Sequence, residues 1–308
     1  MKVKKLLFLF LLTLSAWAQE SIPFQYLPGS DDGLIQGHLI SIPVAVGNGT
    51  RSRFILDTGI GVDLISTRLA QKLKVPSTSM GYTGERMSGQ SVEVPLSYLG
   101  NLTVGREVQK FGTVGVWDFK GFLPDTQAFA DIDGFLGLRF FQHRPFTLDY
   151  REKQLILETP LSLGVREKAG IVVPLEIDDD QNVSITCFAP LEVSGAGPAK
   201  VEIDTGSDSL ILHRRFMPAL GIPDQGDGIR VVREKDETDY SFTRWFTRLR
   251  GNVRLNGEAK LEQRGERVMF QQIIHDGLIG DDFLKHYIVT FDLSHSRMIL
   301  QPFWSPEH

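Results

Sequence analysis

The tripeptide Asp-Thr-Gly occurs twice in the 308-residue sequence, at Asp57–Gly59 and at Asp204–Gly206. Each copy directly follows a short and mostly apolar run, Phe54–Leu56 in the first case and Val201–Ile203 in the second. Asp and Gly favour turns, so one isolated copy would be interpreted as a simple turn at the end of a strand. Two copies in the same context indicate paired chemistry instead.

A carboxylate at the end of a buried strand can be held by its own turn. The glycine two residues later, Gly59 or Gly206, can take an unusual φ and present its N–H to the carboxylate, and the hydroxyl of Thr58 or Thr205 can bond across to a second such turn. Two aspartates in contact cannot both ionise cheaply, so they share a proton and titrate as a unit. One then acts as a general base for a water molecule and the other as a general acid, a pair suited to hydrolysing peptide bonds.

An internal repeat relates the two halves of the chain. A shift of 147 residues places the first Asp-Thr-Gly on the second and Pro43–Val46 on Pro190–Val193. Later in each half the shift is 143, which places Asp133–Gly137 on Asp276–Gly280. We therefore expect two similar lobes that together account for nearly the whole chain after residue 18.

The boundary between the lobes is expected within Glu158–Ala169, a polar stretch that contains Pro160 and Gly164. The first lobe would then span residues 19–167 and the second residues 168–308.

The residue patterns predict an all-β chain with a few short helices. Apolar residues alternate along residues 40–46, and residues 146–157 and 289–300 each resemble a hairpin, with a polar turn between two apolar strands. Residues 84–89 and 233–239 are polar turns that could be flexible hairpin tips. Tyr82, just before the first of these tips, is either a flap tyrosine or an ordinary strand aromatic.

Two helices are expected at matching places in the lobes. Ser66–Leu73 has a possible cap in Ser66 and is stopped by Pro76. The matching segment His213–Leu220 is a weaker candidate because Pro218 interrupts it.

On these motifs the chain resembles the aspartic proteases of the retropepsin/pepsin clan, most of all bacterial retropepsin-like proteins with two lobes in one polypeptide. The resemblance covers roughly residues 22–300 and includes a second family element, an apolar-Gly-apolar-apolar-Gly strand, here Ile132–Gly137 and His275–Gly280. It implies a bilobal fold of two β-barrel-like lobes, with a substrate cleft between them covered by hairpin flaps, and no metal or cofactor.

By the same resemblance, Asp57 and Asp204 are the catalytic pair, and Thr58 and Thr205 bond across the lobes. Two positions depart from the family pattern. The residue after each motif is usually small or hydroxyl-bearing, which Ser207 satisfies and Ile60 does not. Glu202 stands two residues before Asp204, on the same strand face, where the family generally has an apolar residue. A second carboxylate there would raise the cost of ionising the pair.

Composition excludes several other classes of function. The hydrophobic fraction is 42% and the net charge is −5, and the only basic cluster of note is at the extreme N-terminus, so nucleic acid is not an expected partner. The single cysteine, Cys187, excludes an intrachain disulfide and matches Ile40 in the repeat, which favours a buried apolar role. The histidines show no metal-ligand spacing with a third ligand, and no Gly-x-Ser-x-Gly motif of serine hydrolases occurs.

Residues 1–18 have the layout of a secretory signal peptide. Lysines are followed by an apolar run from Leu6 to Leu12 and by Ala16-Trp17-Ala18, with cleavage expected before Gln19. The run is too short for a membrane anchor, which needs about 20 apolar residues. The expected product is a protein secreted or located in the periplasm, with no membrane span.

Two hypotheses of different class follow. The first is an exported aspartic endopeptidase acting on protein or peptide substrates, active as a monomer with a single cleft. The second is a protease-like peptide-binding protein that has the same fold and has lost its chemistry through the changes around Asp57 and Asp204.

Overall fold

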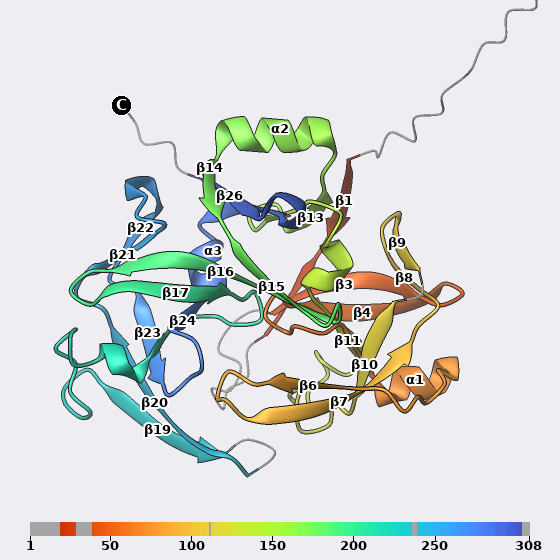
Figure 1. Ribbon diagram of the computed structural model, residues 1–308, viewed down its shortest axis with the longest axis horizontal. Helices are drawn as coiled ribbons and strands as arrows, with labels where there is room; N and C mark the ends of the chain where they lie inside the picture. The colour runs from red at the N-terminus through yellow and green to blue at the C-terminus, as the bar shows by residue number, and fades with distance from the viewer. Residues whose placement is uncertain (1–18, 29–38, 111, 236–238, 304–308) are drawn as a thin grey trace, which may run out of the picture.

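The computed structural model describes residues 19–28, 39–110, 112–235 and 239–303. The predicted signal peptide, residues 1–18, lies outside the described residues, as does part of the predicted hairpin tip at 233–239. Two large sheets, one in each lobe, lie side by side below a third sheet that joins them (Figure 1). The predicted all-β, bilobal fold class is confirmed.

The first lobe is built on a ten-stranded mixed sheet. In spatial order its strands are β6 (Gly81–Glu85), β7 (Ser91–Tyr98), β10 (Thr113–Trp117), β5 (Leu64–Ser66), β11 (Ile132–Leu136), β4 (Thr50–Leu56), β3 (Leu39–Val46), β8 (Asn101–Val104) and β9 (Glu107–Lys110), with β2 (Gln25–Leu27) paired to β3. The sequence of β3 explains why it forms a strand with one face in the core. Apolar residues recur at every second position, and Ile40, Ile42, Val44 and Val46 are all buried.

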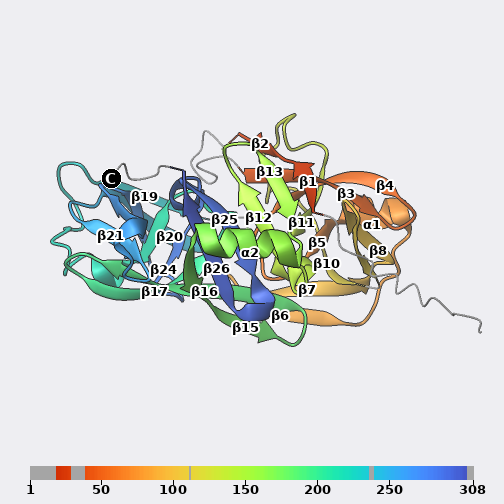
Figure 2. The same ribbon diagram turned by 90° about the horizontal axis from the view of Figure 1, so that it is seen from above.

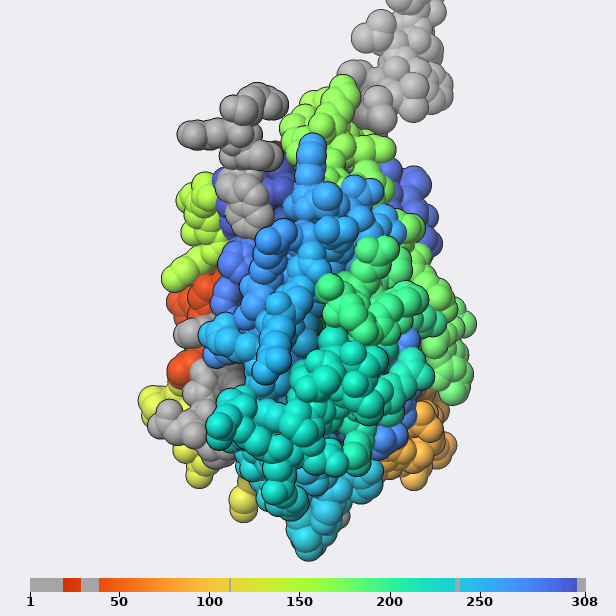
Figure 3. All heavy atoms as spheres, turned by 90° about the vertical axis from the view of Figure 1, so that its left-hand side faces the viewer, coloured from red at the N-terminus to blue at the C-terminus, as the bar shows by residue number. Residues whose placement is uncertain are grey.

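The sheet of the second lobe has the same strand order. Its strands are β19 (Arg230–Lys235), β20 (Ser241–Arg248), β23 (Arg267–Gln271), β18 (Leu210–His213), β24 (Gly277–Ile279), β17 (Gly197–Ile203), β16 (Ser184–Val193), β21 (Asn252–Leu255) and β22 (Glu262–Arg264), with β15 (Glu176–Asp180) paired to β16. Residues of this half form almost all of the face seen from the side of the second lobe (Figure 3).

A six-stranded antiparallel sheet is shared by both lobes. Its order is β1 (Glu20–Pro23), β13 (Gln154–Leu157), β12 (Phe146–Asp149), β25 (Tyr287–Asp292), β26 (Arg297–Pro302) and β14 (Ile171–Pro174). The predicted hairpins of residues 146–157 and 289–300 are β12–β13 and β25–β26, and they pair with each other through β12 and β25.

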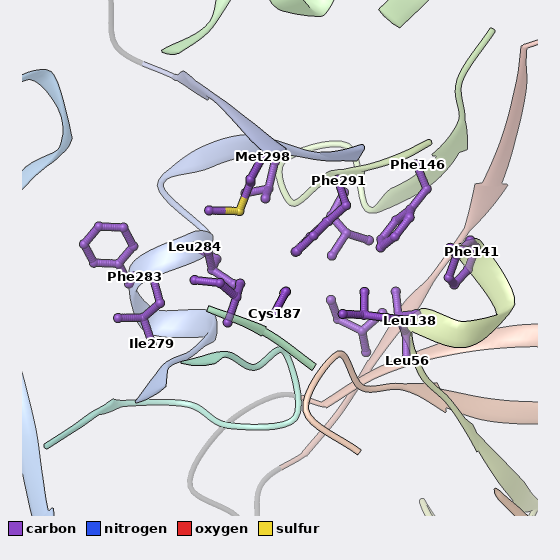
Figure 4. Close-up of a cluster of buried hydrophobic side chains, with 14 of the residues drawn as sticks. Leu56, Leu138, Phe141, Phe146, Cys187, Ile279, Phe283, Leu284, Phe291 and Met298 are labelled. Atoms are coloured by element: carbon purple, nitrogen blue, oxygen red, sulfur yellow. The ribbon is translucent and has the colours of Figure 1, made fainter. Parts of the chain in front are cut away.

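The core below this sheet is made by both halves of the chain (Figure 4). The rings of Phe146 and Phe291 stack 4.9 Å apart with an interplanar angle of 11°. Cys187 is fully buried among apolar side chains such as Leu56 and Leu284, which agrees with the apolar role expected for it.

The described helices are short. They are α1 (Thr67–Leu73), α2 (Pro160–Ala169), α3 (Asp281–Leu284) and the 3-10 turns η1 (Leu138–Phe141), η2 (Arg214–Phe216), η3 (Ala259–Leu261) and η4 (Leu293–His295). Helix α1 begins after Ser66, whose hydroxyl accepts a hydrogen bond from the N–H of Leu69 at 3.0 Å, as its sequence predicts. The weaker helix expected at residues 213–220 of the second lobe is reduced to the short 3-10 turn η2, which ends before Pro218.

The segment interpreted as a polar joint, 158–169, is mostly helix α2, which lies outside the central sheet between the lobes (Figure 2). Thr159 and Ser162 cap its first turn reciprocally, and Pro160 occupies the first helical position, where its missing N–H costs nothing. The proline therefore starts this helix.

Candidate active site

The two Asp-Thr-Gly turns meet at the centre of the molecule and interlock through their threonines. The Thr58 hydroxyl accepts a hydrogen bond from the N–H of Thr205 at 3.0 Å and donates one to the carbonyl of Ile203 at 2.7 Å. The Thr205 hydroxyl accepts from the N–H of Thr58 at 3.1 Å and donates to the carbonyl of Leu56 at 3.1 Å. Both threonines are buried, so each hydroxyl satisfies backbone groups that water cannot reach.

The interlocked turns bring the side chains of Asp57 and Asp204 into hydrogen-bond contact. Each carboxylate also accepts a hydrogen bond from the glycine of its own turn, from Gly59 N–H at 2.9 Å and from Gly206 N–H at 2.8 Å. These donors fix the plane of each carboxylate.

The two glycines are needed for space. Neither Gly59 nor Gly206 has a positive φ, contrary to the expectation of an unusual backbone conformation. A Cβ at Gly59 would collide with the carboxyl group of Asp204, and one at Gly206 would collide with that of Asp57. The approach of the opposite aspartate therefore excludes any side chain at these positions.

Burial and mutual repulsion make ionisation of the pair costly. Burial raises the pKa of Asp57 well above its ordinary value, and the charge of Asp204 raises it further. Burial also raises the pKa of Asp204, against the lowering effect of the Gly206 amide. A pair in this setting holds one proton over a wide pH range, as general acid–base work requires.

Two strands support the turns from behind. Strand β11 runs parallel to β4, and its Leu136 carbonyl accepts the N–H of Asp57 at 3.0 Å. Strand β24 does the same beside β17, where the Ile279 carbonyl accepts the N–H of Asp204 at 3.0 Å. These are the two apolar-Gly-apolar-apolar-Gly segments of the sequence. Their first glycines, Gly134 and Gly277, lie so close to the neighbouring strand that a Cβ would collide with it.

A cavity of about 780 Å³ opens above the pair, lined by residues of both lobes. Hairpin β6–β7 covers it from the first lobe (Figure 1), and Tyr82 on β6 contributes to its lining. Ser207 lines it as well, with its backbone N–H 3.2 Å from the Asp204 carbonyl.

The tip of hairpin β6–β7 reaches the second lobe. The carbonyl of Met87 accepts the N–H of Ile274 at 3.0 Å, and the carbonyl of Ser88 accepts the hydroxyl of Tyr240 at 3.4 Å. The Met87 side chain packs on an apolar cluster of the second lobe that includes Ile211 and Met269. The hairpin is therefore closed over the cavity.

No motif in the sequence predicts that β15 lies at the site, yet Asp178, Asp179 and Asp180 all line the cavity. Asp179 forms an ion pair with Arg139 of the first lobe, which also donates to the carbonyl of Ser184 at 3.2 Å. The shift of 147 residues also places Asp31-Asp32 on Asp178-Asp179, and this alignment is the one feature of the sequence that singles out the acidic run.

Within the described part of the chain, no group of three or more His, Cys, Asp or Glu side chains is arranged to hold a metal ion. No helix among the described residues is long and apolar enough to cross a membrane.

The chain is similar in structure to two solved proteins. It matches soybean basic 7S globulin with a TM-score of 0.50 and 12% identity, and the protein named EDGP with a TM-score of 0.53 and 10% identity. Each match covers 92% of this chain and 94% of the other. No protein-family model and no curated protein matches the sequence.

The topology and these two likenesses define the class: the chain has the bilobal, pepsin-like aspartic-protease fold. At such low identity the likeness concerns the fold alone. The narrower resemblance to bacterial retropepsin-like proteins therefore stays a hypothesis.

Proposed function

We propose that the protein is an aspartic endopeptidase. The observation that carries the proposal is the contact between the Asp57 and Asp204 carboxyls, held by mirrored turns at the floor of a cavity lined by both lobes. Both carboxyls come from one chain, and tethering at an effective concentration on the order of millimolar favours that pairing over pairing between chains. We therefore propose a monomer with one cleft.

The proposed reaction uses one proton shared by the pair. The ionised carboxylate takes a proton from a water molecule, whose oxygen forms a bond to the carbonyl carbon of the peptide. The protonated carboxyl gives its proton to the carbonyl oxygen. The resulting tetrahedral diol then collapses: the C–N bond breaks, the leaving nitrogen takes the proton that the first carboxyl received from water, and the second carboxylate takes a proton from a diol hydroxyl, which becomes the carbonyl of the product acid. The pair thereby returns to its starting state.

The test is cleavage of an unstructured protein by chain without residues 1–18, from acidic to neutral pH, with and without a statine-type transition-state mimic. We expect cleavage that the mimic inhibits. Asp57→Asn and Asp204→Asn should each abolish it almost completely, because each removes half of one site. Asp125→Asn, at an exposed position, is the matched control. Substantial activity in either active-site variant, with elution at the size of a dimer, would show that lobes pair between chains.

One observation favours a second candidate function, a peptide-binding protein without turnover. Glu202 is buried beside the pair, and its burial, together with the charges of Asp204 and Asp57, raises its pKa well above the ordinary value. Three carboxyls in one buried site oppose formation of the ionised base. Folded protein that binds the mimic but cleaves nothing at any pH would favour this candidate.

We also propose that the protein is exported, because charged, apolar and small residues follow one another in residues 1–18 as they do in a signal peptide. Sequencing of the N-terminus after expression in a secreting host should give Gln19. Recovery of intact Met1 in a membrane fraction would contradict the proposal.

A further inference from the structure

Glu202 carries a buried carboxyl group that faces the cavity, and because burial and the charges of Asp204 and Asp57 raise its pKa, a cation bound beside it would stabilise its ionised form. It lies on β17, two residues before Asp204, is 6% exposed and lines the cavity. Its carboxyl group accepts no hydrogen bond from the described residues, and its one ion-pair contact among them is with His275, whose Nε2 lies 3.7 Å from Oε2. Burial and the nearby Lys200 lower the pKa of His275, which keeps its imidazole largely neutral near neutral pH.

The fold does not need a carboxylate at this position. The residue at the same place in the first lobe, two before Asp57, is Ile55, which is fully buried in an apolar cluster with Tyr82 and Phe135. Burying a carboxyl group without hydrogen-bond partners destabilises a folded protein, whereas an isoleucine would stabilise it. The carboxylate of Glu202 is therefore unexplained by packing.

The rest of the cavity lining has the same sign of charge. Four further carboxylates, besides Asp204 and the Asp179 that Arg139 neutralises, line it: Glu85, Asp178, Asp180 and Asp208. The one arginine of the described lining, Arg244, already donates to Gln271 at 3.0 Å and lies 4.0 Å from Glu234. A cleft with one dominant sign of charge concentrates ligands of the opposite sign.

An aromatic wall beside Glu202 also suits a cation. Phe188 lines the cavity, its ring lies 4.9 Å from that of His275, and the ammonium group of Lys200 lies 4.7 Å from its centroid. Lys200 shows that the ring already accepts an ammonium on one face.

We propose that Glu202 binds the ammonium or guanidinium group of a lysine or arginine side chain next to the bond held at Asp57 and Asp204. Two residues along a strand span about 7 Å and place side chains on the same face, so a peptide bond at Asp204 puts a flanking side chain within reach of Glu202. The inference rests on the proposed function only in placing the peptide in this cleft, and it holds equally for binding without cleavage.

The test uses N-acetylated peptides with lysine, arginine, uncharged norleucine or glutamate at either residue flanking the bond. Acetylation removes the terminal amine as a competing cation. We expect kcat/KM to be at least about tenfold higher for lysine or arginine than for norleucine at one of the two positions, and lowest for glutamate. In Glu202→Gln, which keeps the shape and loses the charge, the ratio of lysine to norleucine should approach one.

Glu85→Gln is the matched control, because it removes one cavity carboxylate at an exposed position on the hairpin. It should leave the ratio nearly as in the wild type. Equal loss in both variants would mean that the whole cleft sets the preference and would overturn the assignment to Glu202, as would a wild type without preference.

A binding measurement separates this inference from the proposed function. Affinities of the same peptides for Asp57→Asn, at near-neutral pH, give the ratio of lysine to norleucine without any cleavage. If the wild type cleaves none of the peptides, the endopeptidase proposal fails, and the binding ratio with and without Glu202→Gln still decides the role of Glu202.

Discussion

Each threonine hydroxyl between the two turns serves two buried backbone groups at once. In Thr58→Val the N–H of Thr205 and the carbonyl of Ile203 lose their partner, at a cost of about 1–3 kcal/mol for each unsatisfied group. We expect Thr58→Val to lower the free energy of unfolding by about 2–4 kcal/mol in urea titration, and Thr58→Ser, which restores the hydroxyl, to recover most of it. Equal stability of the two variants would contradict this.

At the residue scale, the sequence predicts which side chains of the two turns come together. It predicts less well the contacts that hold them there. Asp57, Asp204 and both threonines could be placed because the repeated tripeptide and the chemistry of paired carboxylates constrain one another. The turn chemistry predicts that Gly59 and Gly206 are required for their φ angles, whereas the structure shows that the aspartate of the opposite lobe leaves no space for a side chain there. Contacts between residues 145 and 149 positions apart leave no local trace in either turn.

The hairpin β6–β7 is held shut by its tip, and that contact can be tested without any assay of activity. Met87→Ala removes the side chain that packs on the second lobe. We expect the hairpin to open more often, so that trypsin cuts after Arg86 several-fold faster in folded protein. Met80→Ala is the control, because it truncates the same type of side chain at the base of the hairpin. Equal rates for the two variants would exclude a role for the Met87 contact.

Elements could be predicted where their signals are local. The cap at Ser66 marked the start of α1, and the polar turns marked the hairpins of the central sheet. Helix α2 is not predicted, because the polar stretch 158–169 with Pro160 and Gly164 indicates a joint between the lobes. Proline is favourable at the first position of a helix, and Gly164 costs only about 1 kcal/mol relative to alanine there.

The whole molecule contains buried carboxyl groups whose titration opposes folding. Burial raises the pKa of Asp63 to about 7 and that of Asp281 to about 7, from 3.8. A carboxyl group whose pKa is higher in the folded state than in the unfolded state stabilises the folded protein fully when the pH is below the pKa of the unfolded state. This stabilisation is lost as the pH rises from about 4 through about 7. Burial raises the pKa of Asp292 too, but the hydrogen bonds from His295 and Arg297 lower it by more, so the pKa of Asp292 lies below its ordinary value. Its titration therefore changes the stability only at a pH more acidic than this window.

In the wild type the Asp63 carboxyl accepts the N–H of Gly137 at 2.7 Å. Asp63→Asn keeps an oxygen that can accept this hydrogen bond and removes the group that titrates. We expect its stability relative to the wild type to improve from acidic to alkaline pH by at least about 1.4 kcal/mol, the value of one pKa unit. Asp281→Asn should behave alike, and Asp125→Asn should show no such trend. Denaturant titrations across pH measure the differences, and parallel curves for Asp63→Asn and the wild type would refute the expectation.

The bilobal arrangement itself was predictable because two copies of one pattern imply two copies of one unit. The six-stranded sheet was not, since the pairing of β12 with β25 joins two hairpins that each look complete in the sequence. Their union is favoured by contacts between distant residues: the removal of apolar surface from water, as in the stacked pair Phe146 and Phe291, and the buried hydrogen bond between the hydroxyls of Thr147 and Thr290 at 2.7 Å.

The six-stranded sheet shared by the lobes determines the order in which the centre of the molecule can form during synthesis. Its last strand, β26, ends at Pro302, and both β25 and the turn at Asp204 emerge long after the first lobe has been made. A chain that ends before Asp204 carries a single carboxyl at the site, and one that ends before β25 lacks the strand that joins the two hairpins of the central sheet. The complete pair, and the sheet that joins the two lobes behind it, can therefore form only after most of the chain has been synthesised.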